Sequence, residues 1–199
     1  MPTQLNYHAL FPTNIWLSDN VLKESENKAL KKSVLKSYDS KKPYWQSKDS
    51  LQKEKPYSTL VNKVNESSNI IFKNSDLIYS SFKITGMWAN VLRKNETHTP
   101  HTHANNFLSG VYYVQSNDSS ITFVDSRAQA GVIRPKVKNF NKENSSAWSF
   151  PAKENRIIFF PSWLQHYVPP YTKEDLRISI AFNIMFKGLA GDRFESNDF

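Results

Sequence analysis

Histidine is concentrated in one short stretch of this 199-residue chain, the sequence HTPHTH at positions 98–103. His101 and His103 are two residues apart, so both imidazoles project from the same side of an extended segment. Neutral imidazole nitrogen binds iron, zinc, copper and nickel, and a pair on one side supplies two ligands of a metal site. The only later histidine, His166, follows the apolar stretch FFPSW and is the candidate for a third ligand. Because the chain has no cysteine, the metal ligands must be His, Asp, Glu or water.

An arginine, Arg177, lies eleven residues after His166, where the stretch RISIAFNIMF begins. If this stretch is a β-strand, its isoleucines and phenylalanines share one face, and Arg177, Ser179 and Asn183 share the other. A buried arginine needs an anionic partner, because an unpaired charge inside a protein is costly. Nothing in the neighbouring sequence supplies that partner. The stretch therefore predicts a bound carboxylate.

The elements that would position these side chains divide the chain into two parts. Residues 20–38 and 57–72 each contain a stretch of helical periodicity, and a polar loop is expected between them. From residue 77, short β-branched and aromatic runs follow one another, separated by polar stretches of which 128–150 is the longest. We predict one domain over 1–199, with a helical support over 1–75, a β core over 76–187 and a tail over 188–199. The apolar face of the last strand should pack on the helices.

Composition excludes some classes of function. Lys and Arg outnumber Asp and Glu by 26 to 18, but the lysines are scattered among acidic and amide residues, so a nucleic-acid partner is not favoured. No run approaches the roughly 20 apolar residues that span a bilayer, and no signal-peptide pattern is present. We expect a cytoplasmic protein that does not interact with membranes.

The ordered motifs resemble the iron(II)- and 2-oxoglutarate-dependent oxygenase superfamily. FFPSWLQHYVPPYTKEDLRISIAFN is similar to the prolyl-hydroxylase-type segment between the distal metal histidine and the arginine that binds 2-oxoglutarate. Together with WANV, HTHANNFLSGVYYV and FVDSR, it resembles an oxygenase subfamily found in marine bacteria and phages. The resemblance covers residues 8–187 and implies a mainly β fold with α-helices. Its core would be a double-stranded β-helix, of the jelly-roll or cupin-like type, with the N-terminal helices packed on one sheet.

The resemblance also implies roles for individual residues. His101 and His166 would be iron ligands, and Arg177 would pair with the distal carboxylate of 2-oxoglutarate, which suits a planar guanidinium. Ser179 would donate a hydrogen bond to the same carboxylate, and Tyr113 matches a tyrosine that many members direct at that end of the cosubstrate. Polar contacts inside the barrel are expected from two further residues, Asn90 and Asn183.

The third metal ligand departs from the superfamily pattern, which is H-x-D or H-x-E. We favour a site of three histidines, His101, His103 and His166. Two alternatives stay open at this point. His103 is the first ligand and Asn105 occupies the carboxylate position, or Asp125 enters from a neighbouring strand. His98 is expected to lie in the loop behind the ligands.

The implied function is a dioxygenase that hydroxylates an unidentified substrate with O2 and releases succinate and CO2. A metal dioxygenase independent of 2-oxoglutarate and a non-catalytic cupin-like binding protein are the alternatives. The substrate is expected to be a small molecule or a peptide, and the basic residues of the loop over 127–138 suit an acidic one. Four aromatic residues are candidates for walls of the site, although each also suits the core: Tyr112, Phe123, Phe159 and Trp163.

Overall fold

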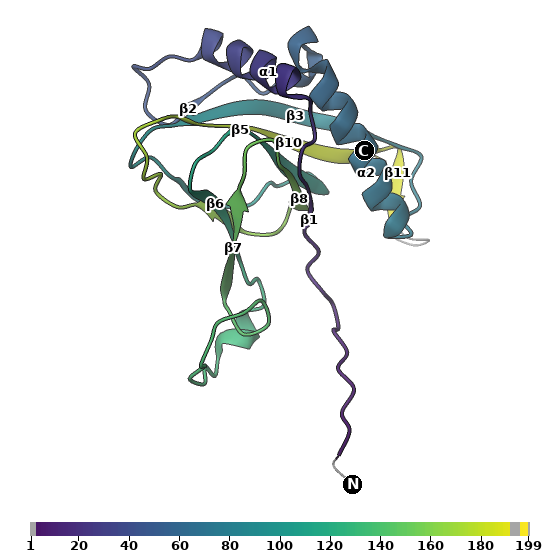
Figure 1. Ribbon diagram of the computed structural model, residues 1–199. Coiled ribbons are helices and arrows are strands. Elements are labelled where there is room, and N and C mark those ends of the chain that lie inside the picture. The colour runs from purple at the N-terminus through teal and green to yellow at the C-terminus, as the bar shows by residue number, and fades with distance from the viewer. Residues whose placement is uncertain (1–2, 192–195, 199) are drawn as a thin grey trace.

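The computed structural model describes residues 3–191 and 196–198, and its strands form two packed antiparallel sheets and a short hairpin (Figure 1). The six-stranded sheet has the order β1-β8-β5-β10-β3-β2 and the four-stranded sheet the order β4-β9-β6-β7. The six strands are β1 Trp16–Ser18, β2 Trp45–Gln46, β3 Ser81–Leu92, β5 Leu108–Gln115, β8 Ile157–Pro161 and β10 Arg177–Lys187. The four strands are β4 His98–His101, β6 Ser119–Val124, β7 Ala147–Ala152 and β9 His166–Val168. This is the predicted double-stranded β-helix.

Two helices cover the outer face of the six-stranded sheet (Figure 1). They are α1 Glu24–Ser37 and α2 Ser58–Asn74, which confirms both helical predictions. α1 begins where the Glu26 side chain accepts a hydrogen bond from the backbone N–H of Lys23, which satisfies a donor that the first turn leaves free. Short 3₁₀ turns occupy Leu51–Lys53, Lys55–Tyr57 and Ala128–Gly131. None of the described helices is long and apolar enough to cross a membrane.

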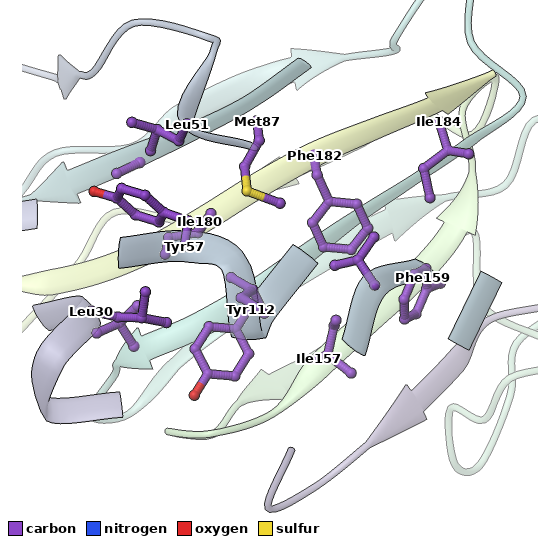
Figure 2. Close-up of a cluster of buried hydrophobic side chains, with 14 of the residues drawn as sticks. Leu30, Leu51, Tyr57, Met87, Tyr112, Ile157, Phe159, Ile180, Phe182 and Ile184 are labelled. Carbon is purple, nitrogen blue, oxygen red and sulfur yellow. The ribbon is translucent and has the colours of Figure 1, made fainter. Parts of the chain in front are cut away.

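The central strand β10 separates two chemically different faces, as its sequence predicts. Its isoleucines and phenylalanines join the core under the helices, where Phe182 packs against Phe159 with ring centroids 5.2 Å apart (Figure 2). The opposite face of β10 carries Arg177 and Ser179 into the space between the sheets. A second apolar cluster, which includes Val111 and Phe160, lies between the two sheets.

Gly110 in β5 is required by the closeness of β10 and β8. A Cβ atom at this position would lie 2.4 Å from the Phe182 ring and 2.7 Å from the Ile158 carbonyl oxygen. Any larger residue would therefore force a neighbouring strand to move. The glycine of LSGVYYV therefore leaves the space that the Phe182 ring and the β8 backbone occupy.

Three expectations about element boundaries need correction. The first of the short runs expected after residue 77 are not separate strands. Residues 81–92 form the single strand β3, which stays paired with β10 across an irregularity near Gly86. The polar stretch over 128–150 is not wholly a loop, since its end belongs to β7, which pairs with β6. The polar loop between the helices contains β2, whose Trp45 pairs with Val91. In each case cross-strand pairing overrides weak local patterning.

The last segment, predicted as a tail over 188–199, contains a backbone pairing. β11 Leu189–Gly191 and β12 Ser196–Asp198 form a two-stranded antiparallel sheet. The division of the chain into a support, a core and a tail stays a prediction.

Candidate metal and cosubstrate site

Three histidines converge between the two sheets. β4 ends at His101, β9 begins at His166, and the two residues are paired across the four-stranded sheet. One potential ligand nitrogen from each of His101, His103 and His166 lies within 4.8 Å of the others. The ring centroids are 4.4 Å apart for His101 and His166 and 5.1 Å apart for the other two pairs. This spacing allows one metal ion to contact all three rings.

The backbone orients two of the rings. Nδ1 of His101 lies 2.7 Å from the Thr99 carbonyl oxygen, and Nδ1 of His166 lies 2.9 Å from the Leu164 carbonyl oxygen. A carbonyl only accepts, so each Nδ1 carries the proton and leaves the Nε2 lone pair free for a metal. The loop after β4 is held by a backbone hydrogen bond of 2.9 Å from His103 to Ser162.

Burial keeps two of these histidines in the form that binds metals. It lowers the pKa of His166 to about 3 and the pKa of His103 to about 4. Both imidazoles are therefore neutral at pH 7, and neutral imidazole is the metal ligand.

Neither alternative third ligand from the sequence lies in the site. The Asp125 carboxylate accepts hydrogen bonds of 3.0 and 2.9 Å from the guanidinium of Arg127, and it lines a different cavity. Asn105 is exposed in the turn before β5. His98 does line the cavity of the three histidines, and burial lowers its pKa to about 4.

Arg177 lines the same cavity as the three histidines, which has a volume of about 550 Å³. It is only 1% exposed, and its Nε and Nη1 donate hydrogen bonds of 2.9 Å to Ser119 and 3.1 Å to Ser179. Among the described residues no carboxylate lies within ion-pairing distance of it. The other buried arginine, Arg156, differs, because Asp19 accepts hydrogen bonds of 2.5 and 2.7 Å from it.

Tyr113 completes the polar end of this cavity. Its ring lies beneath the Arg177 guanidinium at 5.2 Å, and its buried hydroxyl has no hydrogen-bond partner among the described residues. Burial raises the pKa of Tyr113 to about 12, so the hydroxyl is protonated and able to donate. Among the described residues, the buried Arg177 guanidinium has no anionic partner and the buried Tyr113 hydroxyl has no hydrogen-bond acceptor. Both groups therefore fit a carboxylate ligand.

The two asparagines expected in the barrel differ in position. Asn90 is buried and lines the cavity. Asn183 does not line it, because its side-chain oxygen accepts a 2.7 Å hydrogen bond from Ser109. A contact between Asn183 and the cosubstrate stays a prediction.

The aromatic walls of the cavity differ from those expected. Tyr112 and Phe159 lie on the helix side of the sheet, and Trp163 is 56% exposed. Phe123 does pack near His166, with centroids 6.0 Å apart, but Phe160 is closer at 4.5 Å. In β5, Val111 and Tyr113 lie on the cavity side, whereas Tyr112 and Val114 lie on the helix side. The sequence of β5 alone does not show which of the two sets faces the cavity.

Sequence reasoning missed several residues that line the cavity. Tyr44 and Gln46 reach it from β2 and its preceding loop, and Trp88 lines it beside His103, with centroids 5.8 Å apart. Ser119, which fixes Arg177, begins β6. None of these residues has a distinctive spacing relative to the histidines, so their placement required the pairing of β2 with β3 and of β6 with β9.

Comparison with known proteins agrees with this geometry. The family model described as "Putative 2OG-Fe(II) oxygenase" matches residues 86–183, which span the histidines and Arg177. Residues 86–183 belong to this family. The oxygenase therefore uses iron(II) and 2-oxoglutarate as cofactor and cosubstrate, together with O2. No curated protein matches its sequence.

Solved structures share the fold at low sequence identity. The non-heme α-ketoglutarate-dependent epimerase SnoN from nogalamycin biosynthesis is 10% identical with a TM-score of 0.64, covering 92% of this chain and 80% of SnoN. A Pseudomonas putida prolyl-4-hydroxylase is 10% identical with a TM-score of 0.62, covering 88% and 94% of the two chains. Iron-bound HygX from Streptomyces hygroscopicus is 10% identical with a TM-score of 0.59, covering 87% and 82%.

Proposed function

We propose that this oxygenase hydroxylates a small-molecule or peptide substrate and converts 2-oxoglutarate to succinate and CO2. The observation that carries the proposal is Arg177, a buried guanidinium without an anionic partner among the described residues, in the same cavity as three convergent histidines. The similarity to a prolyl-4-hydroxylase structure supports the fold that this reaction needs.

His101, His103 and His166 would hold the iron(II). Their neutral nitrogens match the donor set of a three-ligand site with open positions. Bound iron(II) and 2-oxoglutarate together supply the activation of O2 that inserts an oxygen atom into a C–H bond. Because the three ligands carry no charge, the site would keep the full double positive charge of the ion.

Arg177, Ser179 and Tyr113 would hold the distal carboxylate of 2-oxoglutarate. The guanidinium can make two parallel hydrogen bonds with a carboxylate, and the Tyr113 hydroxyl has a free proton beside it. Ser119 holds the guanidinium in place from the neighbouring sheet.

Apolar side chains would keep water from the reacting centre. Phe160 lies against the rings of His166 and His103, with centroids 4.5 and 6.4 Å away. Val111 and Val168 also line the cavity. A dry site strengthens the pairing of the cosubstrate with Arg177.

The decisive experiment is an anaerobic titration of the iron(II)-loaded protein with 2-oxoglutarate, followed by the visible metal-to-ligand charge-transfer band. We expect a saturable band, and we expect Arg177→Ala to raise the dissociation constant of 2-oxoglutarate at least ~100-fold, since a buried charge pair is lost. The exposed Arg127→Ala variant removes the same charge outside the cavity and should titrate normally. Iron binding without a band in the wild-type protein would contradict the proposal and favour a dioxygenase independent of 2-oxoglutarate or a non-catalytic binding protein.

The third ligand is tested separately by measuring iron(II) affinity. His103→Ala should weaken iron binding strongly, because one of three ligands is removed, whereas His103→Asp should retain it, because a carboxylate is also an iron ligand. Unchanged affinity in His103→Ala would exclude His103 from the metal site. Asp125→Asn is the matched control and should not alter iron binding.

A further inference from the structure

Two segments project from the fold in the same direction and carry most of its strongly exposed apolar side chains (Figure 1). The first is residues 3–15, here called the arm, which leads into β1. The second is residues 125–146, here called the hairpin loop, which connects β6 to β7. Seven large apolar residues in these segments are each at least three-quarters exposed: Leu5, Tyr7, Leu10, Phe11, Val132, Ile133 and Phe140.

The arm and the base of the hairpin loop enclose a trough of about 410 Å³. Tyr7, Phe11 and Ile15 line one side of it, and Trp148 and Phe150 of β7 line the other. The trough shares no lining residue with the cavity of the histidines and Arg177. A protein segment bound in the trough would therefore be separate from the binding site of iron and 2-oxoglutarate.

The charges of the two segments differ and restrict what can cover them. The arm contains no Asp, Glu, Lys or Arg, although charged residues make up 22% of the chain. The hairpin loop carries four basic residues and no acidic one between positions 132 and 142. Two hairpin loops facing each other would repel, whereas an uncharged arm can pack against a hairpin loop without like-charge repulsion.

The exposed apolar area is large enough for a stable interface. Seven large side chains at this exposure present on the order of 1,000 Å², and a standard interface buries about 800 Å² on each partner. Phe11 is also held at a φ of 55° directly before Pro12, a backbone conformation that is costly for an aromatic residue. Its side chain is 92% exposed, so packing against the described residues does little to offset this cost.

We infer that two copies of this chain associate by exchanging arms, so that the arm of each copy packs against the hairpin loop of the other. A two-fold symmetric dimer buries both apolar segments of both copies at once. It keeps the two basic hairpin loops apart, because an uncharged arm lies against each one. The cavities that hold the histidines and Arg177 stay outside the interface.

The first test is the oligomeric state of the full chain by sedimentation velocity from micromolar to near-millimolar concentration. The wild-type protein should sediment at twice the mass of the chain. Phe11→Lys should be monomeric, because it places a positive charge against the basic hairpin loop of the partner. Ile78→Lys is the matched control, since Ile78 is fully exposed outside both segments, and it should remain dimeric. A monomeric wild-type protein, or a dimeric Phe11→Lys variant, would overturn the inference.

Salt separates this dimer from a complex with an acidic protein. Arm exchange is apolar, so the dimer should persist at high salt, where repulsion between the hairpin loops is screened. Dissociation of the homodimer at high salt would show that charge holds it, which contradicts the arrangement. A wild-type chain that is monomeric but binds polyglutamate in a salt-sensitive manner would assign the hairpin loop to an acidic partner instead.

The arrangement itself is tested by cross-linking, because the chain has no cysteine of its own. Leu5→Cys and Ile133→Cys proteins, mixed and oxidised, should form a disulfide-linked heterodimer. The mixture of Leu5→Cys with Ile78→Cys should not. Heterodimer formation supports contact between the arm and the hairpin loop, whereas linkage only between two Ile133→Cys chains would contradict it. Iron and 2-oxoglutarate binding should be unchanged in all of these variants, so failure of the dimer leaves the proposed reaction untouched.

Discussion

Tyr112 and Tyr113 are neighbours on β5, and their hydroxyls lie on opposite faces of the six-stranded sheet. The Tyr112 hydroxyl lies on the helix side, 2.8 and 2.9 Å from the side-chain oxygens of Asn27 and Asn155. The Tyr113 hydroxyl lies on the cavity side, without a hydrogen-bond partner among the described residues. Burial raises the pKa of both tyrosines, so each remains a protonated phenol.

The buried arginines repeat this contrast. Arg156 pairs with Asp19, whereas Arg177 donates to two hydroxyls and lies over an aromatic ring, and no carboxylate of the described residues pairs with it. Among the described residues, Arg177 thus lacks the ionic partner that Arg156 has, and Tyr113 lacks the hydrogen-bond partners that Tyr112 has. Since a buried group without such a partner costs stability, the difference supports a ligand on the cavity side.

The largest effect should come from the helix side of β10. Phe182→Ala removes a fully buried ring that packs against Phe159, and we expect a loss of about 3–5 kcal/mol in the free energy of unfolding. Denaturant unfolding measures this loss. The folded fraction should still bind 2-oxoglutarate with unchanged affinity, because Phe182 lies outside the cavity.

The matched variant on the other face is Arg177→Met. Without ligand, its unfolding free energy should equal or exceed that of the wild-type protein, since a buried charge without an ionic partner is replaced by an apolar group. A large loss of stability in Arg177→Met would show that the guanidinium is structural, which contradicts the contrast between the faces.

A smaller effect should separate the two tyrosines. Tyr112→Phe leaves the buried Asn27 side-chain oxygen without a donor, so we expect a loss of about 1–3 kcal/mol in stability and no change in 2-oxoglutarate affinity. Tyr113→Phe should leave stability unchanged and raise the dissociation constant of 2-oxoglutarate about 5-fold to 10-fold, the contribution of one hydrogen bond. Thermal unfolding and the charge-transfer titration measure the two quantities. If the two variants changed stability and 2-oxoglutarate affinity equally, the proposed difference between the two faces of β5 would be contradicted.

The most gradual effect is a pH dependence of the stability of the iron-free protein. Burial lowers the pKa of His166 to about 3 from an ordinary value of 6.5, so the unfolded chain binds the proton first. The contribution of His166 to the free energy of unfolding should be complete above pH 6.5. It should decrease as the pH drops below 6.5, by at most about 1.4 kcal/mol per pH unit. His166→Gln should flatten the profile, and the exposed His8→Gln should not. A His166→Gln profile as steep as that of the wild-type protein would show that His166 is not buried in the neutral form.

Much of the fold could be predicted because it depends on local pattern. The alternation in RISIAFNIMF identifies the two faces of β10, and the periodicity of residues 57–72 identifies α2. The weakly patterned strands β2 and β7 could not be predicted, since each is held by pairing with a distant strand rather than by its own residues. For the same reason Tyr44, Gln46 and Trp88 were not recognised as lining residues.

The sequence by itself determined the chemistry available to this protein: histidines two residues apart, a third histidine after an apolar strand, and an arginine on the polar face of another strand. Only the tertiary structure decided which of these groups meet. It brought His166 to His101 through the pairing of β9 with β4, and it left Asp125 beside Arg127. It also decided that Arg177 is buried without an ionic partner among the residues that the structure describes. Spacing along one strand fixes the direction of a side chain, but its neighbours across a sheet depend on register and packing of the whole chain.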